Sequence, residues 1–390
     1  MRTPVRVAAA AVVVALAAGC SVGPASDRAA REGVVPAGNG GTGGGDSPEG
    51  DDAGGTGGGT IPEPTDSPEP TEAPEPPPEP APATGTATVA ERLPAGADAS
   101  CCLVALPDGS VLTGSADGGV IQRVTAEGTV TPVGTVNGAT ALLGLAVEPG
   151  FDPSDSGWLY LSYAQGSSAR VARLTYYGAN DPGEQLGSAT DALVTGIPLG
   201  SGRDGGALGF GPDGMLYVGT GDAGVAAQAA DPESYAGKIL RMQPDGRVPA
   251  DNPQEGSLVY ASGHGDVTGF AFDALDRLWA VDAGGADGVE LNSIAPGGDY
   301  AAMPPVHTWP EPFTPGTLAF AAGSLWLPAA GGPGLWRVPL NGTELTADPQ
   351  LLLADEGLTA PAAAQPGPDG DGGLWLLDGG TGDLLRTDVS

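Results

Sequence analysis

Five polar side chains in the middle of the chain could share a chemical site. They are Arg203, Asp204, His264, Asp266 and Glu290. Imidazole and carboxylate groups can accept a proton or bind hydroxyl groups, whereas a guanidinium binds anions and keeps its own proton. If the fold brings the five together, we expect them to bind a small polar or anionic ligand, such as a cell-wall sugar. In the alternative interpretation, Arg203 forms ion pairs with Asp204 and Asp266 that close the site, and His264 is structural.

Metal and thiol chemistry is limited by a small supply of ligands. The chain has three cysteines and two histidines, too few for a zinc or blue-copper centre once Cys20 is assigned to the N-terminal segment. The other two cysteines, Cys101 and Cys102, are adjacent. Outside the cytosol such a pair can persist as a vicinal disulfide. Alternatively, they are two buried strand residues that face opposite sides of a sheet, and both interpretations stay open.

An internal repeat of about fifty residues is expected to position these groups. Each copy starts with a turn residue, one variable residue and an apolar pair, as in GMLY at residues 214–217 and DRLW at residues 276–279. The six copies begin at Gly109, Gly157, Gly214, Asp276, Gly323 and Gly372. Turn residues between short apolar runs indicate antiparallel strands. Six such units predict an all-β fold, a six-bladed β-propeller with one four-stranded sheet per blade.

A second apolar run follows the start of each copy, and it usually ends in arginine. These arginines are expected to be structural: Arg123, Arg173, Arg241, Arg337 and Arg386. Residues 86–93 are expected to pair with the last blade and close the ring. In this arrangement the five polar residues named first should lie on inner strands or loops around one mouth of the central channel.

Residues 1–20 are typical of a targeting segment. Arg2 and Arg6 give a positive start, an apolar stretch follows over residues 7–18, and Cys20 ends the segment. The ending is similar to a bacterial lipoprotein signal, in which the cysteine is lipidated and becomes the mature N-terminus. This predicts an extracytoplasmic protein anchored through Cys20 to the outer face of the bacterial cell membrane. The alternative is an ordinary secretory signal peptide cleaved nearby, and the apolar stretch is too short to span a bilayer.

Residues 21–85 are predicted to form a disordered linker, first Gly/Ser-rich and then Pro/Glu-rich, because they have almost no apolar surface to bury. Residues 86–390 then form the propeller. The chain carries 48 acidic and 15 basic residues, a formal net charge of −33. Such a charge argues against nucleic acids and anionic lipid surfaces as partners. We expect a monomer whose partners are the bilayer, through the lipid, and a small ligand or an envelope protein.

Several longer motifs carry a family resemblance. They occupy residues 142–151, 157–163, 205–217, 236–241, 262–264, 269–273 and 296–300. In this order and spacing they resemble the glucose/sorbosone dehydrogenase family, soluble quinoprotein propellers that use pyrroloquinoline quinone (PQQ) and calcium to oxidise aldose sugars. The resemblance covers residues 142–304. The lipid anchor, spacer and propeller together are similar in layout to mycobacterial lipoproteins and their actinobacterial relatives.

The motifs that carry the chemistry of that family are altered in this chain. The family has its catalytic base in a His-x-Gly-Gly motif, which here reads RDGG, so Arg203 stands in place of the base. The quinone-binding motif Gly-His-Arg-Asn-Pro reads GHGDV around His264. The calcium loop loses its Pro and Asp but keeps its final Glu290, the one metal ligand that the resemblance implies.

A count of cations points the same way. PQQ carries three carboxylates, so a tight site needs several cations, preferably arginines. Lys238 is the only lysine and lies within a repeat strand, and Arg203 is the only uncommitted arginine expected near the channel. The sequence therefore predicts a degenerate site without PQQ or calcium, in a non-catalytic envelope lipoprotein. The alternatives are a diverged PQQ-dependent aldose sugar dehydrogenase and a lactonase-like hydrolase with a calcium ion held by carboxylates.

Overall fold

The computed structural model describes residues 78–390, except 97–98, 189–190, 286, 312, 331–333, 360 and 368–372. The predicted signal segment with Cys20, and the predicted linker as far as residue 77, lie outside the described part. The described ranges contain 26 strands and one short helix, α1 (Ala226–Ala230). No helix in these ranges is long and apolar enough to cross a membrane.

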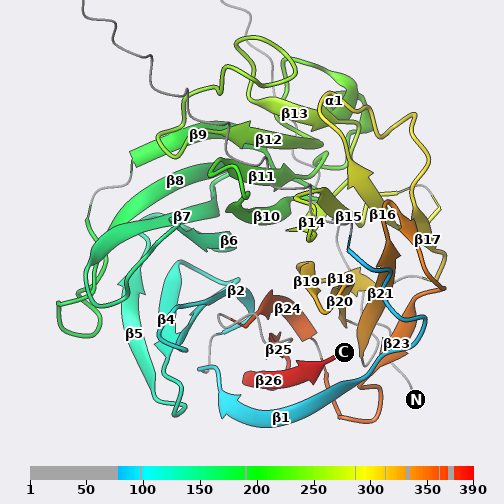
Figure 1. Ribbon diagram of the computed structural model, residues 1–390. Helices are drawn as coiled ribbons and strands as arrows, with labels where there is room; N and C mark the ends of the chain where they lie inside the picture. Colours follow the sequence, from blue (N-terminus) through cyan, green and yellow to red (C-terminus); the bar gives the residue numbers. More distant parts are fainter. Residues whose placement is uncertain are drawn as a thin grey trace, which may run out of the picture. The chain divides into compact units, whose positions relative to one another are not determined.

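Six antiparallel sheets follow one another in a ring, which confirms the predicted six-bladed propeller (Figure 1). Four of the sheets are each built from four consecutive strands. They are β2 (Cys101–Ala105), β3 (Val111–Gly114), β4 (Val120–Val124) and β5 (Val130–Thr135); β6 (Ala141–Val147), β7 (Ser156–Gln165), β8 (Ser168–Tyr177) and β9 (Asp191–Pro198); β10 (Gly205–Phe210), β11 (Leu216–Thr220), β12 (Lys238–Met242) and β13 (Val259–Ser262); β14 (Val267–Phe272), β15 (Leu278–Asp282), β16 (Val289–Ile294) and β17 (His307–Trp309).

The last two sheets differ in their strand composition. They are β18 (Thr314–Pro315), β19 (Ala319–Ala321), β20 (Ser324–Ala330), β21 (Leu335–Asn341), β22 (Glu344–Leu345) and β23 (Gln350–Leu352); and β24 (Pro361–Pro366), β25 (Gly373–Asp378), β26 (Asp383–Val389) and β1 (Ala87–Pro94). β1 pairs with β26 in an antiparallel ladder that begins with Ala87 opposite Val389. The first strand therefore completes the last blade, as predicted for residues 86–93.

The repeat supplies the core between neighbouring sheets. Its fourth position is at most 6% exposed in every copy. The residues there are Leu112, Tyr160, Tyr217, Trp279, Trp326 and Trp375. Tyr160, for example, packs with Leu216 and Val218 of the next sheet. Because burying one large apolar side chain stabilises a fold by about 2 to 3 kcal/mol, the repeat fixes the order of the blades as well as their strands.

Most of the repeat arginines are structural, as predicted. Three of them bind an aspartate of their own blade, in the pairs Arg123–Asp108, Arg173–Asp191 and Arg241–Asp213. Arg337 is fully buried, and its Nη2 donates to the carbonyl oxygen of Pro82 at 3.0 Å. Arg386 differs, because it lies exposed on β26.

The adjacent cysteines interrupt the regular pairing of β2. The register with β3 shifts between Cys101 and Leu103, and Cys102 has a φ of +61°. A Cβ atom added to Gly114 on β3 would lie 3.2 Å from Cys102 Cβ and 3.4 Å from Cys101 Sγ. Both side chains thus lie on one side of the sheet. The expectation that they face opposite sides is wrong, because a bulge breaks the strict alternation of a strand. Both are free thiols in the structure.

Candidate functional site

The inner strands of the sheets line a central channel. Residues near their first ends, such as Gly206 and Gly269, line one cavity, and residues near their last ends, such as Phe210 and Phe272, line another. We call the mouth where these strands begin the loop mouth; it is formed by the segments that carry Arg203, Asp222, His264, Asp266 and Asp282. We call the mouth where they end the turn mouth, because a tight turn such as residues 211–214 leads from there into the second strand. The predicted polar residues all belong to the loop mouth.

Arg203 lies just before β10 and forms an ion pair. Its Nη1 is 3.3 Å from Asp222 Oδ2, and the Asp222 side chain is only 2% exposed whereas that of Arg203 is 42% exposed. Asp222 Oδ1 also accepts a hydrogen bond from Gly224 N at 2.7 Å. The predicted pairing of Arg203 with Asp204 or Asp266 is therefore wrong. Asp204 instead accepts a hydrogen bond from Gly200 N within its own loop.

Asp266 connects two blades at the loop mouth. It is buried at the start of β14, and its Oδ1 accepts a hydrogen bond from Gly205 N on β10 at 2.8 Å. Burial, with the nearby carboxylates of Asp282 and Asp204, raises the pKa of Asp266 to about 7. Near neutral pH this carboxyl therefore exists in both forms, and it can donate as well as accept a hydrogen bond.

Asp282, at the end of β15, organises the same mouth. It accepts three backbone hydrogen bonds, from Gly265 N at 2.9 Å, Asp266 N at 2.7 Å and Gly284 N at 2.8 Å. Although burial alone would raise it, the pKa of this carboxyl is lowered by His264 and the backbone N–H groups. Asp282 therefore stays ionised and fixes the loop that presents Asp266.

His264 is part of this support. It is 1% exposed, its Nδ1 lies 3.3 Å from Asp282 Oδ2, and its ring stacks on Tyr300 with centroids 4.8 Å apart. A ring so enclosed cannot meet a ligand at the mouth without rearrangement of its neighbours. The geometry favours the structural interpretation of His264.

Glu290, on β16, lies at the edge of the same cluster. Burial and the Asp282 carboxylate raise the pKa of Glu290. Within the described residues, no group of three or more His, Cys, Asp or Glu side chains is placed to hold a metal ion. Glu290 therefore remains a single candidate ligand.

Asp222 and Asp282 are site residues that the sequence analysis missed. Each lies at the end of the second strand of its blade or just after it, in an Asp-x-Gly motif, and Asp378 repeats the motif in the last blade. In all three the Oδ1 atom accepts a hydrogen bond from the Gly N two residues later, at 2.7, 2.8 and 3.0 Å respectively. Aspartate side chains commonly form this local turn with the backbone two residues later, so the repeated motif could have identified these residues from the sequence.

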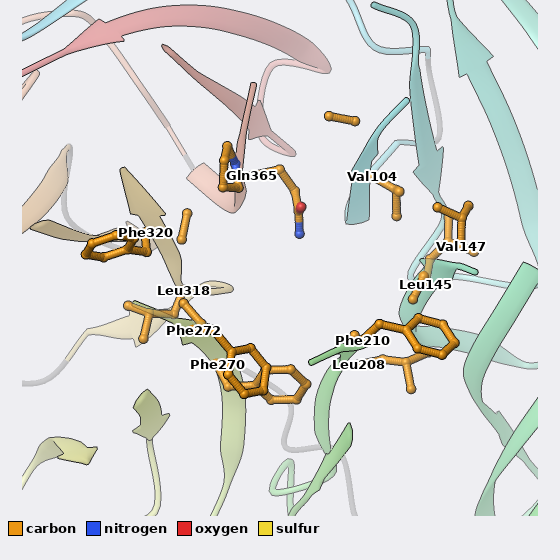
Figure 2. Close-up of a pocket in the computed structure, with 16 residues that line it drawn as sticks. Val104, Leu145, Val147, Leu208, Phe210, Phe270, Phe272, Leu318, Phe320 and Gln365 are labelled. Atoms are coloured by element: carbon orange, nitrogen blue, oxygen red, sulfur yellow. The ribbon is translucent and has the colours of Figure 1, made fainter. Parts of the chain in front are cut away.

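The turn mouth has a different chemistry. A cavity of about 340 Å³ opens there, within the range of about 300 to 1,000 Å³ that is usual for small-molecule sites, and all six inner strands line it. Four of the six phenylalanines of the chain contribute: Phe210, Phe270, Phe272 and Phe320. Figure 2 shows the amide of Gln365 pointing into the space between these rings. No charged side chain is among the described residues that line it.

Comparison with known proteins agrees with this fold. A family model described as glucose/sorbosone dehydrogenase matches residues 98–315. Quinoprotein glucose dehydrogenase B of Acinetobacter calcoaceticus is 29% identical over 234 residues, which are 50% of this chain and 48% of that protein. An uncharacterised protein of Synechocystis sp. is 33% identical over 184 residues, or 41% of this chain and 42% of the relative. The chain thus spans about half the length of the curated relatives that it matches.

A solved structure covers more of the chain. The PQQ-bound form of aldose sugar dehydrogenase from Streptomyces coelicolor superimposes with a TM-score of 0.75 and 36% identity, over 80% of this chain and 100% of that one. The chain belongs to the glucose/sorbosone dehydrogenase family, as its motifs implied.

The residues of the loop mouth do not fit the PQQ that this family implies. Arg203 is the one cation in the described cluster, and a buried aspartate already partners it. Lys238 is committed as well, because its Nζ donates to the carbonyl oxygens of Gln228, Ala229 and Ala236 at 2.7 to 3.0 Å. Apart from the enclosed His264 and Tyr300, the remaining ionisable neighbours are carboxyl groups, which repel a tricarboxylate when they are ionised.

Proposed function

We propose that this chain is a lipid-anchored, extracytoplasmic propeller that binds a ligand or partner at the cell surface and does not oxidise sugars through PQQ. The observation that carries the proposal is the Arg203–Asp222 ion pair at the position of the family's catalytic base. A guanidinium cannot take the proton that sugar oxidation must remove. Asp222 also neutralises the positive charge of Arg203, which could otherwise have bound a quinone carboxylate.

The chemistry of the loop mouth favours a neutral, hydroxyl-rich ligand over an anionic one. Asp204 and Glu290 are partly exposed, and Asp266 is buried with a raised pKa of about 7. Carboxyl groups of this kind accept hydrogen bonds from hydroxyls, and a protonated Asp266 donates one. A sugar unit of the cell wall has the required groups and carries no charge that these acids would repel.

The N-terminal sequence supports the proposed location. A positive start, an apolar stretch and Cys20 match a lipoprotein signal, and an acidic Pro-rich stretch follows that would hold the propeller away from the bilayer. Labelling the cells with a radioactive or alkyne-tagged fatty acid tests this directly. The protein should carry the label, and the Cys20→Ser variant should not.

A dye-linked oxidation assay tests the proposed loss of catalysis. The full chain is incubated with PQQ and calcium and then supplied with a panel of aldoses and an electron-accepting dye. We expect no sugar-dependent dye reduction above the rate with cofactor alone. Sugar-dependent turnover that disappears in an Asp282→Ala variant, where the loop mouth is disrupted, would overturn the proposal.

A diverged PQQ-dependent aldose sugar dehydrogenase is the second candidate. The similarity to a PQQ-bound aldose sugar dehydrogenase, over the whole length of that chain, favours it. It requires quinone contacts other than the cations of the family motifs, and the same assay decides between the two functions.

A further inference from the structure

The thiols of Cys101 and Cys102 form a pair that the proposed function does not use. A Cβ at Gly114 would contact both residues, so the two side chains lie next to each other on one side of the sheet. Cys102 reaches this position with a φ of +61°, a left-handed conformation that is uncommon and costly for a residue with a Cβ. An ordinary strand would separate neighbouring side chains to opposite faces. The bulge thus brings two reducing groups together at the cost of local strain.

We propose that Cys101 and Cys102 are a redox modification site, at which an external disulfide compound oxidises the two thiols to a vicinal disulfide. In the first step the Cys101 thiolate attacks the external disulfide, forms a mixed disulfide and releases one external thiol. In the second step Cys102 attacks the Cys101 sulfur and releases the second external thiol. The two cysteines together lose two electrons and two protons, and the external disulfide is reduced to two thiols.

The surroundings of the two sulfurs give this order of reaction. Cys101 is half-buried, whereas Cys102 is only 7% exposed, so Cys101 is the thiol that an external reagent reaches. The hydrogen bond with Cys101, together with burial, raises the pKa of the Cys102 thiol. The thiolate that starts an exchange is therefore the one on Cys101, and Cys102 is held within reach to complete it.

Oxidation at this point would alter the wall of the channel. Cys102 lines a small cavity of about 40 Å³ with Leu143, Gly206 and Gly269, which belong to the next inner strands and lie close to the loop mouth. Glycine is required here, since a Cβ on Gly206 would lie 2.7 Å from the carbonyl oxygen of Leu143. Packing this close transmits a change at Cys102 to the neighbouring strands.

The test counts thiols in the folded full chain. A Cys20→Ser variant leaves Cys101 and Cys102 as the only cysteines, since the chain has three. The protein is treated in buffer with hydroxyethyl disulfide, freed of reagent, unfolded, alkylated with iodoacetamide and weighed by mass spectrometry. We expect a monomer that takes up no alkyl group after oxidation and two after treatment with a phosphine reductant.

Two further variants serve as matched controls. In the same background, Cys101→Ser and Cys102→Ser each keep one thiol. After oxidation this thiol should be either unreacted or part of a mixed disulfide, and the reductant should return the mixed disulfide to the free thiol. The Cys101→Ser protein should react more slowly than the Cys102→Ser protein, because its remaining thiol is buried. Circular dichroism confirms that both variants are folded.

The proposal is overturned if the folded Cys20→Ser protein keeps two alkylatable thiols after oxidation. It is equally overturned if both cysteines end as mixed disulfides, or if the product is a disulfide-linked dimer. Equal rates for the two single variants would contradict the order of the steps.

Discussion

The two mouths of the channel are built from the two ends of the same six inner strands, yet their chemistry is opposite. The loop mouth gathers Arg203, Asp222, Asp266 and Asp282, tied to backbone N–H groups and to each other. The turn mouth gathers phenylalanine rings around the amide of Gln365 (Figure 2). The blades therefore specify the channel, and the segments at each end specify what it can bind.

The two mouths are also stabilised by different interactions. At the loop mouth, buried carboxylates satisfy backbone donors, so removal of one acceptor leaves several groups unpaired. At the turn mouth, rings pack against rings, so removal of one leaves a cavity that its neighbours can partly fill. Substitutions at the two mouths should thus differ in both size and pH dependence.

The largest effect is expected for Asp282→Ala. Three backbone N–H groups lose their acceptor, and His264 loses its neighbouring charge. At about 1 to 3 kcal/mol for each of the three donors left unpaired, the free energy of unfolding should fall by about 3 to 9 kcal/mol. Urea denaturation at neutral pH measures this. Asp282→Asn, which keeps one carbonyl acceptor, should lose clearly less, and equal losses for the two variants would contradict the role given to these hydrogen bonds.

The next effect is the pH dependence that Asp266 contributes. Its pKa is about 7 in the folded protein, against about 3.9 in an unfolded chain, so the folded state binds the extra proton between these values. This contribution to stability is fully present below about pH 4 and is lost as the pH rises through about 7, a change of about 2 to 4 kcal/mol. Asp266→Asn should flatten that part of the stability profile. An unchanged profile in the variant would show that folding does not raise the pKa of Asp266.

A smaller effect is expected at the turn mouth for Phe270→Ala. The ring is half-buried and contacts Phe272 and Tyr217 at centroid distances of 6.4 and 6.3 Å. Because part of its surface is already exposed, the loss of stability should be about 2 kcal/mol, below the 3 to 5 kcal/mol that is typical of a fully buried ring. Thermal unfolding measures it across pH 4 to 7. A loss that varies with pH over this range would mean that the two mouths are coupled.

The smallest effect is expected for Arg203→Ala. Its ion pair with Asp222 is open to solvent on the arginine side, and Asp222 keeps the hydrogen bond from Gly224 N. The cost should be about 1 kcal/mol or less and should shrink in high salt. Denaturation at low and high ionic strength checks this. A cost of several kcal/mol, independent of salt, would mean that the pair is a buried structural element.

The repeat made the fold predictable from sequence, because a turn residue and a large buried apolar residue recur at the same positions in every blade. The same repeat predicted the structural role of Arg241, whose aspartate partner occupies a turn of fixed position. The site was predictable only in part. Because Arg203, His264 and Asp266 come just before inner strands, the sequence placed them at one mouth. It could not show that Arg203 pairs with Asp222, since this pairing depends on the fold of the loop at residues 221–224.

The sides taken by Cys101 and Cys102 were not predictable for a related reason. Side chains alternate between the two faces of a sheet only where the strand pairing is regular. No residue type at the start of β2 indicates the bulge that breaks this alternation. The group of four phenylalanines at the turn mouth was also missed, because they come from three different strands and share no local motif.

Calorimetric titration of the full chain with PQQ in the presence of calcium tests the central claim most directly, namely that the loop mouth has lost the quinone site of its family. The aldose sugar dehydrogenase of Streptomyces coelicolor, solved in its PQQ-bound form, serves as the positive control under the same conditions. We predict no saturable heat of binding for this chain, where the control gives a clear one. Saturable binding in the micromolar range or tighter, weakened by Arg203→Ala, would contradict the account and assign Arg203 to a quinone site of a new kind.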